Sequence, residues 1–237
     1  MNQVKRKGWH ALLTLVMACL SQGCDVKRIG EEGLLTFHPD NCGTYALGCS
    51  FDKPIAVGGS IEVRLSQNLE GEELMLRVGD STRFDVKPTP SGASRTFEVT
   101  ALSSGETALS AVNQAGESVD HVAIKAVDME SLRLRPFTNL SDEPDDSIDG
   151  VDTYFIAEGK LVSFWVGPDV GGQWHGMGRF SFALVEASAA LEEAIQAEEN
   201  TDIEQGFIAF RMPSGDQSMA LATLDGEHVI QLAFVAD

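Results

Sequence analysis

The stretch of the sequence with the densest potential ligands is an acidic run from Asp142 to Asp152. Part of this run matches the opening of a calcium loop, with oxygen donors at the first, third and fifth positions and Gly150 for the sharp turn at the sixth. Carboxylate and hydroxyl oxygens are the ligands that calcium prefers. The candidate ligands are Asp145, Ser147, Asp149 and Asp152.

The calcium pattern is incomplete at its last position. A calcium loop needs a bidentate carboxylate at its twelfth residue, which here is Ile156. Asp152 or Glu158 would have to substitute at an unusual spacing. We therefore keep two interpretations. The run is either a calcium site that rigidifies a linker or, as the charge pattern favours, an acidic solvated linker between two domains.

A second segment with functional side chains is the Gly-rich stretch Gly167–Gly178. It lacks the Lys-Ser/Thr ending of a phosphate-binding loop and opens no helical pattern, so we interpret it as a long hairpin loop. Trp174 and His175 lie near its tip, and exposed aromatic residues on loops often form contact surfaces. Packing of Trp174 against its own hairpin is the alternative.

The remaining side chains give no catalytic pattern. The histidines outside the N-terminal segment share no metal-ligand spacing, and the chain has no Gly-Xaa-Ser-Xaa-Gly motif. Paired carboxylates carry no information in so acidic a sequence. We predict that the protein is not an enzyme and that calcium is its only candidate cofactor. The scattered histidines are His38, His121, His175 and His228.

Two cysteines, Cys42 and Cys49, lie seven positions apart in a Gly-containing stretch. In an oxidising compartment we expect them to form a disulfide, worth about 2–3 kcal/mol in a loop this small. A two-cysteine metal site with His38 is the alternative, although zinc sites usually have tighter spacing and more ligands.

The N-terminal segment has the layout of an export signal. Three positive residues, Lys5 to Lys7, precede the apolar stretch Gly8–Leu20, which has no Asp, Glu, Lys or Arg. That stretch is too short to span a bilayer, which needs about 20 apolar residues. A buried core helix is the alternative, but it would rarely begin with three positive charges or lack a polar face.

The residues Leu20-Ser21-Gln22-Gly23-Cys24 then resemble the lipobox of bacterial lipoproteins. The resemblance implies that Cys24 is acylated and anchors the mature chain to a membrane. Cys19 is a rival site, but its use would leave Cys24 unpaired beside the Cys42–Cys49 pair. A soluble secreted protein is the alternative. The predicted location is the cell envelope, on the inner or outer membrane, facing the periplasm or the exterior.

The charge of the chain limits its partners. The net charge is −19, and removal of residues 1–23 takes away three positive charges and leaves −22. Such a charge disfavours nucleic acid and adhesion to anionic lipid. The expected partners are the membrane, through the lipid anchor alone, and an envelope protein or a surface glycan.

From residue 33 onward, short alternating apolar and polar runs recur about every ten residues. This pattern predicts antiparallel sheets in an all-β sandwich or barrel. The residues Ala56-Val57-Gly58-Gly59, Ser103-Ser104-Gly105 and Ala115-Gly116-Glu117 resemble the start and end of a bacterial immunoglobulin-like domain, and this similarity covers residues 56–127. The resemblance implies a β-sandwich that serves as a spacer or an interaction module.

A second sandwich is expected after residue 131, because the residues 215–226 resemble residues 105–116 as a weak internal repeat. A short helix is predicted within residues 186–199, where Leu191 and Ile195 recur at helical spacing. The leading functional hypothesis is a non-catalytic, lipid-anchored spacer or interaction module. The alternatives are a binding module, adhesin-like or inhibitor-like, that uses residues 167–178, and an enzyme of unrecognised type. The predicted boundaries are 1–23 for the signal peptide, 24–32 for a tether, 33–130 for the first domain and 131–237 for the second.

Overall fold

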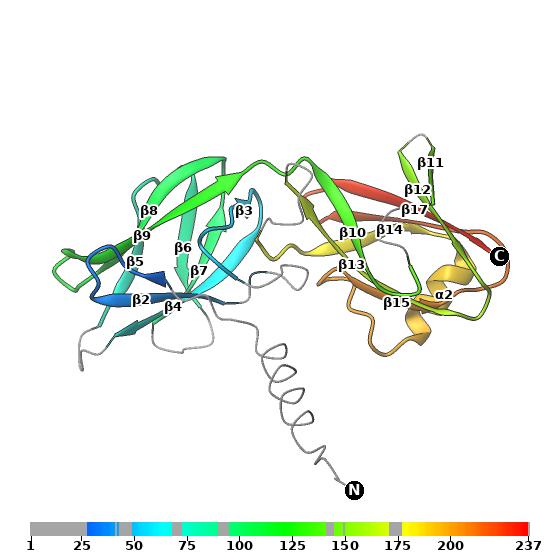
Figure 1. Cartoon of the computed structure of the whole chain (residues 1–237), viewed down its shortest axis with the longest axis horizontal. Coiled ribbons are helices and arrows are strands. Elements are labelled where there is room, and N and C mark those ends of the chain that lie inside the picture. Colours follow the sequence, from blue (N-terminus) through cyan, green and yellow to red (C-terminus); the bar gives the residue numbers. More distant parts are fainter. Residues whose placement is uncertain are drawn as a thin grey trace, which may run out of the picture.

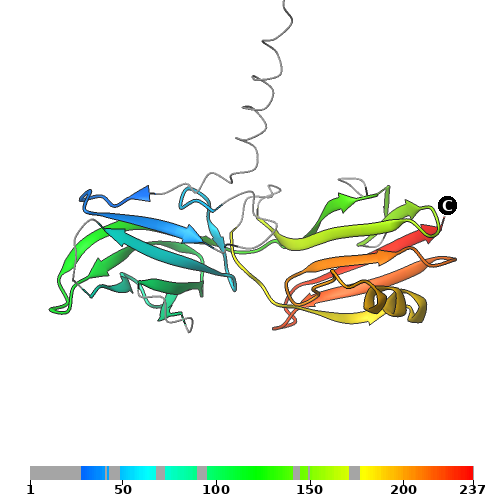
Figure 2. The ribbon, with the colours of Figure 1, turned by 90° about the horizontal axis from the view of Figure 1, so that it is seen from below.

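The structure is a computed structural model that describes residues 28–40, 42, 49–67, 73–89, 95–140, 145–148, 150–170 and 177–236. The predicted fold class is confirmed: the chain is all-β, with two immunoglobulin-like sandwiches in tandem. They lie end to end along the long axis of the molecule, the first from blue to green and the second from green to red (Figure 1). The view in Figure 2 shows the same arrangement from below.

The first sandwich packs a five-stranded sheet against a four-stranded sheet. The five-stranded sheet has the order β1 (Arg28–Ile29), β2 (Leu35–Asp40), β4 (Ser60–Gln67), β7 (Thr96–Ala101) and β6 (Phe84–Pro88). The four-stranded sheet has the order β3 (Ile55–Ala56), β9 (Ser118–Val127), β8 (Gly105–Val112) and β5 (Met75–Val78).

The second sandwich packs a three-stranded sheet against a five-stranded sheet. The three-stranded sheet has the order β10 (Ser131–Thr138), β13 (Leu161–Asp169) and β15 (Phe207–Arg211). The five-stranded sheet has the order β11 (Asp146–Ile148), β12 (Val151–Ile156), β17 (Val229–Ala236), β16 (Gln217–Thr223) and β14 (Phe182–Ala187).

Both sandwiches follow one plan. The order β2-β4-β7 in the first corresponds to β10-β13-β15 in the second, and β3-β9-β8-β5 corresponds to β12-β17-β16-β14. In each, an early strand pairs in parallel with the last strand, β3 with β9 and β12 with β17, while the other pairings between strands are antiparallel. The strand orders agree with the predicted internal repeat. These two closing pairs are the parallel exceptions to the predicted antiparallel pattern.

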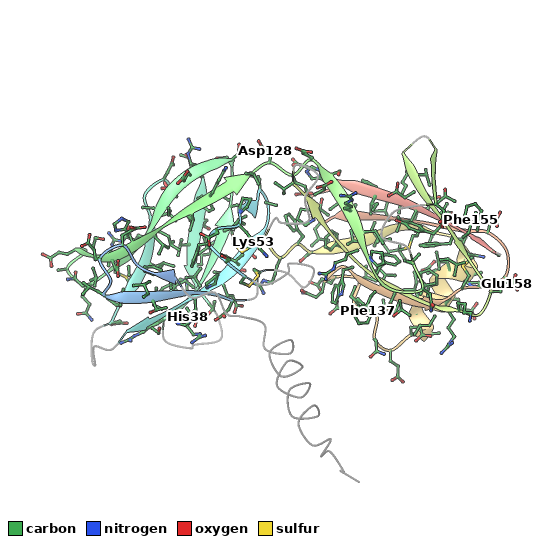
Figure 3. The ribbon with its side chains drawn as sticks, in the orientation of Figure 1. His38, Lys53, Asp128, Phe137, Phe155 and Glu158 are labelled. Carbon is green, nitrogen blue, oxygen red and sulfur yellow. A yellow bond between two sulfur atoms is a disulfide. The ribbon has the colours of Figure 1, made fainter. Side chains whose placement is uncertain are left out.

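The alternation that predicted the strands also fills the core. On β4, Ile61, Val63 and Leu65 are buried, and they alternate with the polar side chains of Glu62 and Arg64. Side chains of this kind fill the space between the sheets in both sandwiches (Figure 3). Strand β2 was missed because its buried residues 37–39 are consecutive, which breaks the alternation at Pro39. Strand β10 alternates at Leu132 and Leu134 only until Pro136.

The predicted helix is confirmed but shorter. Helix α2 runs from Ala189 to Ala197, and its apolar face buries Leu191 and Ile195. Residues 186 and 187 instead end strand β14, because Glu186 and Ala187 pair with β16. The helix lies between β14 and β15, where the first sandwich has strand β6, at the end of the second sandwich that points away from the first (Figures 1 and 2).

Two expectations about the connections were wrong. The acidic run is not a linker between domains, because β11 and β12 pair as a hairpin within the second sandwich. The Gly167–Gly178 stretch is not a hairpin loop, because β13 and β14 belong to opposite sheets and residues 167–169 still belong to β13. The connection between the sandwiches is instead the short segment Asp128–Glu130.

A buried carboxylate fixes the start of the first sandwich. Asp120 on β9 is fully buried, and its two oxygens accept hydrogen bonds from the backbone N–H groups of Glu32, Leu34, Leu35 and His121, at 2.8–2.9 Å. Burial alone would raise the pKa of Asp120, but these donors outweigh it and hold the pKa below its usual value. One side chain thereby joins the turn before β2 to the last strand of the sandwich.

We predict that Asp120→Asn lowers the free energy of unfolding by about 2–3 kcal/mol, because the amide cannot accept all of these bonds. The control Asp128→Asn, at an exposed position, should change it by less than about 0.5 kcal/mol. Urea unfolding of the three proteins at pH 7 measures the difference.

The folded pKa of Asp120 lies below the unfolded value of about 3.9. Its contribution is therefore fully present above that pH and is lost as the pH falls through the folded pKa. The difference in the free energy of unfolding between wild type and Asp120→Asn should therefore become smaller below about pH 4. A difference that stays constant down to pH 2 would contradict the assignment.

Candidate functional site: the joint between the two sandwiches

The feature with the most specific geometry is the contact between residues 54–60 of the first sandwich and residues 177–181 of the second, which we call the joint. Residues 177–181 belong to the connection between β13 and β14, and they lie along the first sandwich where β3 ends and β4 begins. The joint therefore lies between the two halves of the molecule in Figure 1.

Backbone hydrogen bonds cross the joint as they would cross a sheet. The Met177 N–H donates to the Pro54 carbonyl and the Ala56 N–H donates to the Met177 carbonyl, both at 2.8 Å. The Arg179 N–H donates to the Ser60 carbonyl at 2.6 Å, and the Ser60 N–H donates back at 3.2 Å. Both strand edges are thereby satisfied by the other sandwich, which fixes the register between the two.

Two glycines bring the backbones into contact. A Cβ atom on Gly59 would lie 2.8 Å from the Phe180 ring and 2.9 Å from the Cα atom of Gly178. Gly178 has a φ of +135°, and a Cβ atom there would lie 3.0 Å from the Cα atom of Gly59. No other residue type fits at either position without movement of the backbone, so the pair sets how closely the sandwiches approach.

The two hydrophobic cores exchange a residue across the joint. Ala56 of the first sandwich is fully buried within the core of the second, and Met177 of the connecting segment is buried in the core of the first. The Met177 sulfur also accepts a hydrogen bond from the Ser50 N–H at 3.3 Å. Separation of the sandwiches would expose both side chains to water, which costs about 25 cal/mol per Å² of apolar surface.

An ion pair closes the polar side of the joint. The Arg179 guanidinium donates to Glu98 at 2.9 Å and lies 3.7 Å from Glu62, and both acidic residues belong to the first sandwich. Ser60 donates to the same Glu98 oxygen at 3.2 Å. The Arg179 side chain is only 25% exposed, so solvent screens this contact less than it screens a surface salt bridge.

The predicted disulfide lies next to the joint. Cys42 and Cys49 are bonded, and the Cys42 carbonyl accepts a hydrogen bond from the Gly178 N–H at 2.9 Å. Cys42 is buried in the same core as Met177. The disulfide therefore holds one of the acceptors on which the second sandwich is docked.

The covalent linker is short and bonded on both sides. Met129 is buried in the core of the second sandwich. On the side of the first sandwich, the Val127 carbonyl accepts a hydrogen bond from the Val57 N–H at 2.8 Å. On the side of the second, the Glu130 N–H donates to the Asp169 carbonyl at 3.0 Å. Asp128 lies at the boundary between the sandwiches (Figure 3). Linker and joint thus form two separate connections, which restricts rotation between the sandwiches.

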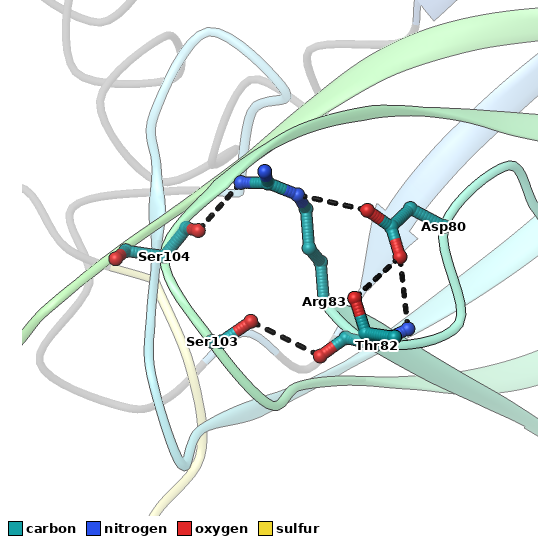
Figure 4. A network of polar contacts seen from close by, with 5 residues as sticks. All are labelled: Asp80, Thr82, Arg83, Ser103 and Ser104. Atoms are coloured by element: carbon teal, nitrogen blue, oxygen red, sulfur yellow. Dashed lines mark hydrogen bonds and ion pairs between the residues drawn. The ribbon is translucent and has the colours of Figure 1, made fainter.

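A polar network supports the first sandwich beside the joint (Figure 4). Arg83 donates to Asp80 at 2.9 Å and to the Ser104 carbonyl at 2.6 Å, while the Ser103 hydroxyl donates to the Thr82 carbonyl at 3.0 Å. Hydrogen bonds from Thr82 and Arg83 hold the pKa of Asp80 below its usual value. The network joins the turn before β6 to the turn after β7. The last residue of β7, Ala101, accepts a backbone hydrogen bond from Gly58 and donates one to Gly59.

The structure describes three of the four candidate calcium ligands, namely Asp145, Ser147 and Asp152. Asp145 is exposed and accepts from the Phe155 N–H at 3.1 Å, Ser147 lies opposite Asp152 in the ladder, and Asp149 lies outside the described residues. Among described residues no three His, Cys, Asp or Glu side chains are grouped to hold a metal ion. The calcium site stays a prediction, which calorimetry with calcium would test.

The other predicted site residues lie outside the described residues. These are the lipidation candidates Cys24 and Cys19 and the contact residues Trp174 and His175. No helix in the described ranges is both long and apolar enough to cross a membrane. The binding-module alternative, with its 167–178 loop, also stays a prediction.

Sequence reasoning singled out both halves of the joint but not their contact. The Ala56-Val57-Gly58-Gly59 motif was attributed to the start of a domain, and the Gly-rich stretch to a loop. The available signal was the unexplained glycine pair beside a small residue, which indicates a close backbone approach.

No protein-family model and no curated protein sequence matches this chain. Among solved structures, the chain is similar to domains 4–9 of the surface layer protein SbsC, at 12% identity and a TM-score of 0.30, over 86% of this chain and 31% of that one. It is similar to fibronectin(III)-like modules of Clostridium thermocellum CbhA, at 10% identity and a TM-score of 0.26, over 78% of this chain and 89% of that one. It is also similar to the Yersinia pseudotuberculosis adhesin InvE, at 11% identity and a TM-score of 0.27, over 78% of this chain and 56% of that one. The chain spans about a third of the SbsC structure and just over half of the InvE structure, and likenesses this weak identify no function.

We predict that Gly59→Ala opens the joint, because its Cβ atom would overlap Phe180 and Gly178. Overpacking of this kind costs about 1–3 kcal/mol. Hydrogen exchange followed by mass spectrometry should show faster exchange in the peptide that contains Met177 and Arg179. The control Gly159→Ala has a φ of +72° and open space around it, so it should cost about 1–2 kcal/mol and leave that peptide protected. If this peptide exchanges equally slowly in both variants, Gly59 does not set the closure of the joint.

Proposed function

We propose that this protein is a non-catalytic, lipid-anchored spacer of the bacterial cell envelope, which holds the far end of its second sandwich at a fixed distance and orientation from the membrane. The observation that carries the proposal is the joint. A chain that only needed two domains could connect them by a flexible linker, which is the default expectation between domains. Here backbone hydrogen bonds, an exchanged core residue and an ion pair oppose rotation.

The envelope location is supported by the N-terminal sequence and the disulfide. Lys5 to Lys7 and the apolar stretch that follows have the order of an export signal, and Cys24 is placed for acylation. The Cys42–Cys49 bond would persist in an oxidising compartment outside the cytosol. Two or more acyl chains give stable anchoring, whereas one is marginal.

The anchor is tested by the intact mass of the protein extracted from native membranes, with and without reduction before alkylation. We expect a mass that corresponds to acylated Cys24 onward, and no alkylation of Cys42 or Cys49 without reductant. A mass that retains residues 1–23 would overturn the export signal. Acylation at Cys19 would move the anchor to that residue. A free thiol at Cys42 would contradict a location in an oxidising compartment.

The spacer role is tested by small-angle X-ray scattering of the unacylated chain. The wild type should scatter as one elongated rigid particle with the two sandwiches end to end, and Gly59→Ala should require a mixture of orientations. Gly159→Ala again serves as the control and should scatter like the wild type. If the wild type itself needs many orientations, the spacer proposal fails even if the anchor is correct.

A further inference from the structure

The joint contains a pocket that its structural role does not explain. The pocket has a volume of about 270 Å³, and both sandwiches contribute to its lining. Ligand pockets occur preferentially at domain interfaces, and this volume lies just below their usual range of about 300–1,000 Å³. Its polar lining residues are Ser60, Thr100, Arg179, Ser181, Thr223 and Asp225.

Several of these polar groups have hydrogen-bonding capacity to spare. Within the described part of the chain, the hydroxyls of Thr100 and Ser181 have no protein partner, and the Arg179 Nε atom is buried without one. One oxygen of Asp225 accepts from Thr223 and Glu227, which leaves its other oxygen for a ligand. Hydroxyls both donate and accept, so the pocket offers donors and acceptors together.

The charges around the pocket disfavour an anion. Arg179 already faces Glu98 and Glu62, so its positive charge is compensated. Asp225 adds a further negative charge, and the hydrogen bond from Thr223 together with the Glu227 N–H holds its pKa below the usual value. A carboxylate or phosphate ligand would meet three carboxylates and one guanidinium. These charges therefore disfavour an anion, and among the remaining ligands one with several hydroxyl groups matches the hydroxyl and carboxylate lining.

The remaining lining is apolar. Leu224 is 68% exposed, and the buried Phe180 ring and Gly58 complete the wall. The Leu224 N–H donates to the Ser181 carbonyl at 3.0 Å, which fixes this wall against the hydroxyl side. A ligand that fits must present hydroxyl groups on one side and C–H groups on another, within the space of a single ring.

We infer that the pocket in the joint binds a neutral sugar ring, either as a monosaccharide or as one unit of a longer glycan. Thr100 and Ser181 bond to its hydroxyls, the free Asp225 oxygen accepts from one of them, and Leu224 contacts its C–H face. A single ring in so small a pocket binds weakly, with a Kd in the millimolar range. The inference depends on a closed joint, because both sandwiches line the pocket, but it depends neither on the lipid anchor nor on a role as a spacer.

The experiment is saturation-transfer difference NMR on the full mature chain with glucose, galactose, mannose and N-acetylglucosamine at millimolar concentration. Acetate and ethanolamine serve as charged probes of similar simplicity. The test variant is Thr100→Val with Ser181→Ala, which removes the two free hydroxyls with little change in shape. The control is Thr138→Val with Ser131→Ala, the same chemistry on β10 outside the pocket. Thermal melting checks that both variants fold.

We expect at least one sugar to give a signal that the test variant loses and the control keeps. Three results would overturn the inference: no signal from any of the four sugars, a signal that the test variant retains, or a signal from acetate or ethanolamine alone. None of them bears on the intact mass or on the scattering of the wild type, so the spacer proposal is judged separately.

Discussion

The contact between Gly59 and Gly178 is the constraint on which the arrangement of the two sandwiches depends. Because neither residue has a side chain, the two backbones approach closely enough for hydrogen bonds to form on both sides of the contact. Only at that distance does Met177 reach the first core and Ala56 the second. Larger residues would remove the hydrogen bonds and the apolar burial together, since both depend on the same separation.

The polar groups of the joint follow from this close approach. Burial of backbone N–H and C=O groups is costly unless each finds a partner, and here each sandwich supplies partners to the other. Arg179 belongs to the same segment, and Glu98 offsets the partial burial of its charge. The disulfide holds the Cys42 carbonyl that receives the Gly178 N–H. Covalent, polar and apolar contacts therefore act on one short segment.

Duplication of one sandwich plan explains both the similarity and the asymmetry of the halves. The strand orders correspond, and each sandwich closes with a parallel pair. They differ where the first has strand β6 and the second has helix α2, and where the second carries the β11–β12 hairpin. In the second sandwich the segment before β14 also forms part of the joint. The same plan thus supplies a docking surface in one half and the docked segment in the other.

The sequence by itself determined the all-β class, most of the strands, the short helix and the cysteine pair. Those features depend on local alternation, helical spacing and cysteine parity, which act over a few residues. It predicted less well where Pro39 and Pro136 interrupt a strand, and where the acidic run forms a hairpin. Only the tertiary structure brought Gly59 to Gly178, Arg179 to Glu98, and Asp120 to the turn before β2. These contacts join residues about 80 to 120 positions apart, and their partners are set by how whole sheets pack, which no local pattern encodes.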